Sequence, residues 1–282
     1  MNSNRGYLYI ATGIHFLREA QKSCKSLKNA GAKYPVVLFT DVPESADPYL
    51  FDHIYNIDKP KFNFIDKIQP LASSPFEETI FLDTDTYVCE DISPLFQLLE
   101  KYDFIGSFAP GRQQKTFKVN VPLYFPEFNT GLIGFRKNVV TKHVIERWLN
   151  LYILQLKTSN PPHDQPAFRQ ALFESEALVY NLPSEYNFRT EHPNVVWGNS
   201  TVKMIHGRHS KYDQLSIMLN QNEEQIRLFY HDARFLQSDS LRFFKLNQNR
   251  SFYFKIVLAI YGYAHRMIYR LLGDGKPLKK KG

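Results

Sequence analysis

Short apolar runs that alternate with helical patterns constrain the fold of this chain most strongly. Residues 7–11 form an apolar run, and after Thr12 and Gly13 apolar residues recur at helical spacing as far as Gly31. A second apolar run covers residues 35–41. A strand, a helix and a second strand in this order predict parallel strands covered by helices. Ligands of such sheets bind beyond the carboxyl ends of the strands.

The rest of the first 215 residues continues this alternation. Further apolar runs predict strands at 54–57, 79–82, 104–108, 130–135, 178–182 and 202–206, and helical patterns lie at 61–73, 92–102, 139–157 and 163–176. Residues 109–128 have no clear period and are long enough for a functional loop. We therefore expect one α/β domain over residues 5–215. A helical tail over 216–282 would follow, amphipathic and basic from about residue 252.

The location of the positive charge bears on possible partners. The 282-residue chain has a formal net charge of +7. Residues 242–282 contain ten Lys or Arg and one acidic residue, whereas the preceding residues contain 25 basic and 27 acidic ones. Because the main body is slightly acidic, it lacks the basic surface that nucleic-acid binding requires. We expect no nucleic-acid partner.

Cysteine content and hydropathy indicate the compartment. Cys24 and Cys89 can form one bridge at most, so a disulfide scaffold is excluded and a reducing compartment is favoured. The first residues lack the apolar run of a signal peptide. The longest uncharged apolar stretch, 256–264, is shorter than the roughly 20 residues that cross a bilayer. We expect a cytoplasmic protein that can contact the inner face of a membrane peripherally.

Asp83 and Asp85 directly follow the predicted buried strand 79–82. In extended backbone, residues two apart project to the same side, so the two carboxylates lie together. They raise each other's pKa unless a cation neutralises them. Hard divalent ions prefer carboxylate, phosphate and water oxygens. The pair therefore predicts a Mn²⁺ or Mg²⁺ site that holds a diphosphate, and the alternative is a turn capped by two Asp side chains.

Residues 81–87, with the sequence FLDTDTY, resemble the Asp-x-Asp segment of GT-A glycosyltransferases, especially the glycogenin-like group. The likeness extends to the first strand and helix, to Lys67, to residues 128–136, and to the sequence His-Asp-Gln that begins at His163. Aspartate-nucleophile phosphatases also carry an acidic pair, but they need Thr or Val where this chain has Tyr87. The resemblance implies a GT-A-like (Rossmann-like) mixed sheet flanked by helices.

The resemblance also implies which residues bind the donor and the metal. The nucleoside would be held by Thr12, Gly13 and Asp41. The metal would be held by Asp83, Asp85 and His206, and Asp83 would also contact the ribose-diphosphate. The late lysine that neutralises the diphosphate would be Lys211, although the family pattern His-x-x-Gly-x-x-Lys reads His-Gly-Arg-His-Ser-Lys in this chain.

Around the reacting sugar the resemblance implies a second group of residues. Lys67 would contact the donor phosphate or sugar, Asn129 and Gly131 would line the sugar pocket, and Asp164 and Gln165 would face the reacting sugar. Simpler interpretations remain open for some of these residues. Lys67 could be an exposed helix residue, and Asp164 could cap the N-terminus of a helix. His206 could be a core histidine at the end of a strand.

We therefore predict a metal-dependent glycosyltransferase that moves a sugar from a nucleotide-diphosphate donor, a UDP-sugar, to a hydroxyl of a carbohydrate or lipid-linked acceptor. The glycogenin-like resemblance favours retention of configuration. An inverting enzyme would need a carboxylate base, with Asp164 first and Glu127 second. One alternative is a nucleotidyltransferase, which should carry a Gly-rich basic loop after its first strand, where this chain has His15 and Phe16. The other is a non-catalytic module that binds carbohydrate or membrane.

The pattern over residues 252–272 is that of an amphipathic helix. An apolar face would collect Tyr253, Ile256, Ile260, Ala264, Met267 and Leu271, and a basic face would collect Lys255, Arg266 and Arg270. Three lysines follow at 279–281. Such a helix can lie on an anionic membrane surface. The alternative is a terminal helix that packs on the core.

Overall fold

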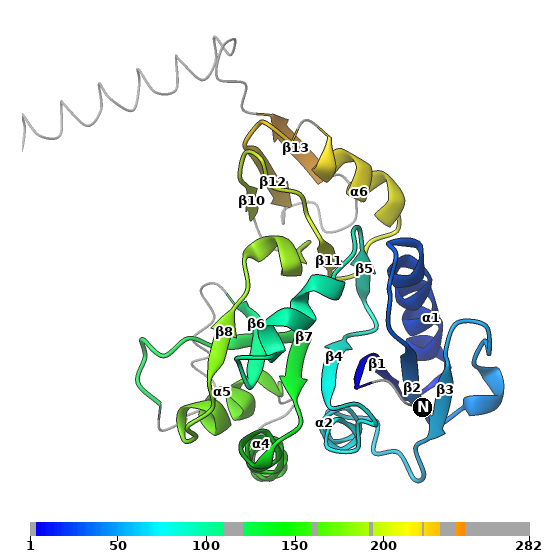
Figure 1. Cartoon of the computed structure of the whole chain (residues 1–282), viewed down its shortest axis with the longest axis vertical. Helices are drawn as coiled ribbons and strands as arrows, with labels where there is room; N and C mark the ends of the chain where they lie inside the picture. The colour runs from blue at the N-terminus through cyan, green and yellow to red at the C-terminus, as the bar shows by residue number, and fades with distance from the viewer. Residues whose placement is uncertain are drawn as a thin grey trace, which may run out of the picture.

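The computed structural model describes residues 4–109, 121–158, 163–191, 194–221, 223–231 and 241–245, the strands 228–231 and 241–245 by their backbone alone. Its centre is a seven-stranded sheet of order β3-β2-β1-β4-β7-β6-β8 (Figure 1). The strands are β1 (Arg5–Ala11), β2 (Val36–Thr40), β3 (His53–Asn56), β4 (Glu78–Leu82), β6 (Phe104–Phe108), β7 (Phe128–Arg136) and β8 (Val179–Asn181). Of these, β7 alone runs antiparallel to its neighbours. The expected mixed α/β sheet is confirmed.

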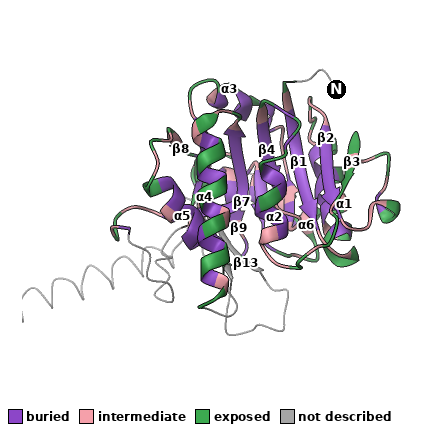
Figure 2. Ribbon diagram, turned by 90° about the horizontal axis from the view of Figure 1, so that it is seen from below, coloured by how far each residue is buried: buried purple, intermediate pink, exposed green. Residues whose placement is uncertain are grey.

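Helices cover both faces of this sheet. On one face lie α1 (Ile14–Asn29) and the short α3 (Phe96–Leu99), and on the other lie α2 (Ile65–Leu71), α4 (Val139–Leu156) and α5 (Gln165–Phe173). In Figure 2, α2 and α4 lie in front of the sheet, and α4 has an exposed outer side whereas α2 is largely buried. Alternate residues of β1 enter the two cores, with Tyr7 and Tyr9 on the α1 side and Leu8 and Ile10 on the other. Burial on both faces explains why the predicted strands are continuous apolar runs.

Two smaller sheets extend the domain beyond the carboxyl end of β4. The first has the order β5-β11-β9 and consists of β5 (Thr86–Val88), β11 (Met204–His206) and β9 (Phe188–Arg189). The second has the order β10-β12-β13 and consists of β10 (Asn194–Val196), β12 (Arg227–His231) and β13 (Leu241–Lys245). Helix α6 (Tyr212–Asn220) lies in sequence between β11 and β12. The pairing of β5 with β11 brings the chain after Asp85 against the strand that ends in His206.

Several predicted elements are shorter than expected, and three 3₁₀ turns were not predicted. These turns are η1 (Pro43–Ser45), η2 (Ser93–Leu95) and η3 (Ser184–Asn187). The predicted helix 61–73 begins only at Ile65, because the Asp66 carboxylate accepts the backbone N–H groups of Lys61 and Phe62 and holds them in a loop. The predicted helix 92–102 divides into η2 and α3.

The expectation of a helical tail from residue 216 needs correction. Helix α6 ends at Asn220, and the described elements that follow it are the strands β12 and β13. Both strands are rich in Phe, Leu and Tyr, which favour extended backbone. The predicted amphipathic helix over 252–272 and the basic residues after it lie outside the described residues. A domain boundary at 215 therefore stays a prediction.

Candidate functional site

The carboxyl ends of the central strands meet at one edge of the sheet, where a cleft opens. Strands β1 and β4 are neighbours, so Thr12 and Asp83, which follow them, lie at the same edge. Because β7 is antiparallel to β4, its first residues lie at this edge too, and Asp83 donates its backbone N–H to the carbonyl of Gly131 over 2.8 Å. A cavity of about 620 Å³ lies here. The reversal of β7 thus brings its first residues to the ends of the parallel strands.

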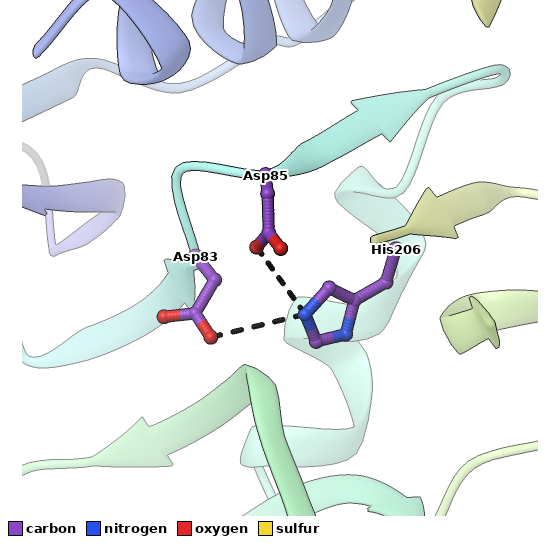
Figure 3. Close-up of side chains that lie close together, drawn as sticks. All are labelled: Asp83, Asp85 and His206. Atoms are coloured by element: carbon purple, nitrogen blue, oxygen red, sulfur yellow. Dashed lines mark ion pairs between the residues drawn. The ribbon is translucent and has the colours of Figure 1, made fainter. Parts of the chain in front are cut away.

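Asp83, Asp85 and His206 converge on one point of this cleft (Figure 3). His206 Nε2 lies 3.4 Å from Asp85 Oδ1 and 3.9 Å from Asp83 Oδ2. Two ligands of one octahedral ion with bonds of about 2.1 Å stand about 3 Å apart. The three side chains therefore fit a small divalent cation after slight contraction, and the two carboxylates suit a hard ion such as Mg²⁺ or Mn²⁺.

The backbone of the acidic pair is held at both ends. The Thr86 hydroxyl donates to the carbonyl of Asp83 over 2.8 Å, and the Gly207 N–H donates to the carbonyl of Asp85 over 3.0 Å. Behind Thr86 lies a buried series of hydroxyl groups, with Ser23 Oγ 2.6 Å from Thr86 Oγ1 and Tyr9 Oη 2.9 Å from Ser23 Oγ. This network fixes the turn against α1 and β1, so the two carboxylates are oriented before any ligand arrives.

Burial and neighbouring charges act differently on the two carboxyl groups. Burial raises the pKa of Asp83, and the charge of Asp85 adds to this effect, although Lys67 opposes it. Burial also opposes the ionisation of Asp85, but the neighbouring side chains of His206 and Arg208 outweigh it and hold the pKa of Asp85 well below its usual range. A divalent cation would relieve the repulsion between the two carboxylates.

Lys67 lies inside the cleft rather than on the outside of its helix. Its Nζ atom is 3.0 Å from Asp83 Oδ1 and 3.3 Å from Asp164 Oδ2, and it donates to the carbonyl and hydroxyl of Thr130 over 3.0 Å. The side chain is buried against the ring of Phe81. Burial lowers the pKa of Lys67, but the charges of Asp164 and Asp83 outweigh it and raise that pKa. The structure thus excludes the exposed-helix interpretation, and Lys67 is a cation between two carboxylates.

Asp164 and Gln165 lie at the start of α5 and line the cleft. The Thr130 hydroxyl contacts both carboxylate oxygens of Asp164 at 3.1 and 3.2 Å. Asp164 occupies the N-cap position of α5, but its side chain makes no capping hydrogen bond to the helix backbone, so capping does not explain this carboxylate. Gln165 accepts a hydrogen bond from the Asn129 side chain over 3.0 Å. These two positions therefore share a polar wall with the first residues of β7.

Four of the predicted site residues do not line this cavity themselves, namely Gly13, Asp41, Gly131 and Lys211. Gly13 donates its backbone N–H to Asp41 Oδ1 over 2.6 Å, which ties the loop after β1 to the loop after β2. Gly131 lies beneath the ring of His206, where a β-carbon would come within 2.0 Å of Cε1. Lys211 is exposed just before α6. Thr12 does line the cavity.

Several other residues of the cleft were not predicted as site residues. Arg208 lies 4.0 Å from Asp85 and forms two hydrogen bonds with Glu19 of α1. Arg189 of β9, which lies between the predicted strands 178–182 and 202–206, pairs with Glu191. Phe62 is 68% exposed at the cleft and has a φ of 53°, an unusual value for a bulky side chain. Each of these residues reaches the cleft from a loop or short strand, where no periodic pattern marks it.

Comparisons with known proteins agree with this geometry. A model of the nucleotide-diphospho-sugar transferase family matches residues 18–215. A search of curated proteins found no match. Among solved structures, the fold resembles the galactosyltransferase LgtC in complex with donor and acceptor sugar analogues, with a TM-score of 0.57 and 14% identity over 77% of this chain and 96% of LgtC. An active-site mutant of LgtC has a TM-score of 0.56 and 13% identity over the same shares.

A more distant similarity is to the glycosyltransferase GlyE of Streptococcus pneumoniae TIGR4. Its TM-score is 0.49 and its identity 17%, over 67% of this chain and 47% of GlyE. At identities this low, the LgtC comparison carries the GT-A-like fold and no more.

Proposed function

Since this chain belongs to the nucleotide-diphospho-sugar transferase family, a family of glycosyltransferases, we propose that it moves a sugar from a UDP-sugar to an acceptor hydroxyl in a metal-dependent reaction. The observation that carries the proposal is the convergence of Asp83, Asp85 and His206 beside Lys67 in one cleft. The acceptor would be a carbohydrate or a lipid-linked acceptor.

The proposal gives the metal ligands and the cations separate tasks. Asp83, Asp85 and His206 would hold Mn²⁺ or Mg²⁺, which supplies Lewis-acid stabilisation of the departing diphosphate. Lys67 orients Asp83 and Asp164 and keeps a positive charge next to the donor sugar. We assign the diphosphate contact to Arg208 in place of Lys211, because Arg208 lines the cleft near Asp85. Electrostatic stabilisation of this kind is commonly the largest contribution to catalysis.

The remaining predicted residues have supporting places in this proposal. Thr12 would contact the nucleoside, while Gly13 and Asp41, bonded to each other, would shape the loop around it. Asn129 would face the donor sugar from the start of β7. Gly131 would contribute by leaving room for His206 rather than by touching the sugar. Asp164 and Gln165 would face the reacting sugar from α5.

We further propose that the configuration at the anomeric carbon is retained. An inverting enzyme needs a carboxylate that can take the acceptor proton. Among the described residues that line the cleft, each carboxylate already has a partner: Asp83 and Asp164 have Lys67, Asp85 has His206, and Glu191 has Arg189. Glu127, the second candidate base, is buried and does not line the cleft. In a retaining reaction, an oxygen of the departing diphosphate accepts the proton instead.

A screen of nucleotide sugars tests the proposed function. Incubated with Mn²⁺, the protein should hydrolyse one UDP-sugar slowly without an acceptor, and chelation of the metal should stop the release of UDP. A non-catalytic module would bind ligand without releasing UDP, and a nucleotidyltransferase would release pyrophosphate from a nucleoside triphosphate. Once an acceptor is found, NMR of the product determines the anomer, and an inverted product would overturn the retaining assignment.

The sequence of residues 252–282 supports a separate proposal about where the protein is located in the cell. No helix among the described residues is both long and apolar enough to span a bilayer. We propose that the protein is cytoplasmic and that residues 252–282, with their basic and apolar patterns, bind the inner face of an anionic membrane. The full chain should float with vesicles that contain phosphatidylserine, and a chain that ends at residue 251 should not. Equal flotation of both would contradict the proposal.

A further inference from the structure

We propose that Asn187 and Asn129 form a chain of side-chain amides that fixes the imidazole of His206 with Nε2 toward the metal position. The inference rests on the proposed metal site and assigns positioning roles to residues next to its ligands. Asn187 ends η3, a short turn that no feature of the sequence marks as functional. Its side chain lies between His206 and Asn129.

The orientation of the two asparagine amides is determined first by a backbone group. The N–H of Gly131 can only donate a hydrogen bond, and its acceptor is Asn129 Oδ1 at 3.1 Å. The oxygen and nitrogen of the Asn129 amide are thereby distinguished, which geometry alone seldom does for an amide side chain. The same oxygen accepts from Asn187 Nδ2 at 2.9 Å. The Asn187 amide is therefore oriented with its nitrogen toward Asn129.

The oxygen of Asn187 then determines the state of the histidine ring. Asn187 Oδ1 lies 2.8 Å from His206 Nδ1, and an amide oxygen can only accept. Nδ1 must carry the proton, so in the neutral ring the lone pair belongs to Nε2. Nε2 is the atom that faces Asp83 and Asp85. The amide chain thus presents His206 in the tautomer that a metal ligand needs.

At the other end of the hydrogen-bonded series, Asn129 determines which atoms of Gln165 can bind a ligand. Asn129 Nδ2 donates to Gln165 Oε1 over 3.0 Å, so this oxygen is already bonded within the protein. Gln165 is left with the two N–H donors of its amide, which suit a sugar hydroxyl or a phosphate oxygen. One series of four side chains therefore connects the metal ligand to the residue that faces the reacting sugar.

All four side chains of this hydrogen-bonded series are buried, so the loss of any one hydrogen bond should have a measurable effect. Gln165, Asn129, Asn187 and His206 are each at most 6% exposed. Hydrogen bonds in such surroundings are stronger than in water. A buried polar group left without its hydrogen-bond partner also costs more free energy than an exposed one. Replacement of residues that orient metal-bound histidines commonly costs about 10- to 100-fold in metal affinity.

The test compares three asparagine variants by Mn²⁺ titration of the otherwise intact protein. Asn187→Ala removes the acceptor for Nδ1–H and should weaken Mn²⁺ binding by about 10- to 100-fold. Asn187→Asp restores an acceptor for Nδ1–H and should bind Mn²⁺ more tightly than the alanine variant. Asn220→Ala is the matched control, because Asn220 makes two comparable bonds to the backbone of Val202 away from the cleft. It should leave Mn²⁺ affinity unchanged even if it lowers the melting temperature.

A second measurement determines which ring nitrogen of His206 carries a proton. In protein with ¹⁵N-labelled histidine and saturating Mg²⁺, the signals of His206, identified by their loss in His206→Gln, should show a proton on Nδ1 and none on Nε2. A proton on Nε2 would overturn the inference, and so would parent-like Mn²⁺ affinity in Asn187→Ala. Failure of the metal site itself is distinguishable, because the parent protein would then not bind Mn²⁺ at all.

Discussion

Replacement of Asp85 by asparagine should abolish metal-dependent release of UDP from the donor while leaving the fold intact. We expect a loss of rate on the order of 10²- to 10³-fold or more, the range seen when one group that stabilises developing charge is removed. Binding of Mn²⁺ should weaken in parallel, measured by calorimetry with the metal alone. The effect should be larger than that of any substitution at the nucleoside end of the cleft.

The reason lies in the arrangement around Asp85. Its carboxylate faces His206 at 3.4 Å and Arg208 at 4.0 Å, so it is held ionised and oriented. An asparagine has nearly the same shape but carries no charge, and its amide nitrogen would face the metal in one of its two orientations. Asp83 alone cannot compensate, because Lys67 already neutralises part of its charge.

Asp213→Asn is a matched control for this substitution. Asp213 is a carboxylate near the start of α6 that accepts a hydrogen bond from Tyr87 and does not line the cleft. It should leave both activity and Mn²⁺ affinity close to those of the parent. If Asp85→Asn keeps the parent's Mn²⁺ affinity and rate at an unchanged melting temperature, the proposed metal site is wrong.

The central sheet could be predicted because its strands are buried on both faces. Runs such as 79–82 contain no polar residue except at their ends, and the helix after the first strand shows its buried stripe in the spacing of Leu17, Ala20, Cys24 and Leu27. Strand β11 lies within the predicted strand 202–206, but its pairing with β5 and β9 in a small sheet could not be predicted. The strands of this sheet have two or three residues each, and β5 and β11 are separated by more than a hundred residues. No local period marks pairing of this kind.

The same division applies to the candidate site. Asp83 and Asp85 stand out because two charges follow an apolar strand, and the order of motifs along the chain pointed to His206 and Lys67. Asn187 gives no such signal, because its role depends on partners that come from β7 and β11. The sequence could suggest Gly131 as a lining residue, but only the packing of His206 against it reveals the steric reason for a glycine.

Replacement of Gly131 by alanine should weaken metal binding strongly, because it displaces the ligand His206. The added methyl group would lie 2.0 Å from His206 Cε1 and 2.2 Å from Nδ1, far inside any normal contact distance. The backbone of Gly131 cannot retreat easily, because it bonds Asp83 through its carbonyl and Asn129 through its N–H. The histidine ring must therefore move by about 1 Å or more to restore ordinary packing distances.

That movement would disrupt both sides of the ring. The 2.8 Å bond from Nδ1 to Asn187 would break, and Nε2 would leave its place beside Asp85. We expect Mn²⁺ affinity to fall by about 10- to 100-fold or more, since the displaced ring loses the group that orients it. Overpacking of a buried site also costs about 1–3 kcal/mol in the free energy of unfolding. Calorimetry with Mn²⁺ and thermal denaturation measure the two effects separately.

Gly134→Ala separates the loss of metal from the loss of stability. Gly134 lies three residues further along β7, and a β-carbon there would lie 2.4 Å from Cγ1 of Ile105 in the core. The cost of Gly134→Ala in stability should be comparable, because the overlap with Ile105 is of similar severity. The residues that it would displace do not belong to the metal site. Gly134→Ala should therefore melt at a lower temperature and keep the parent's Mn²⁺ affinity. Equal losses of affinity in both glycine variants would mean that general destabilisation, and not displacement of His206, accounts for the result at Gly131.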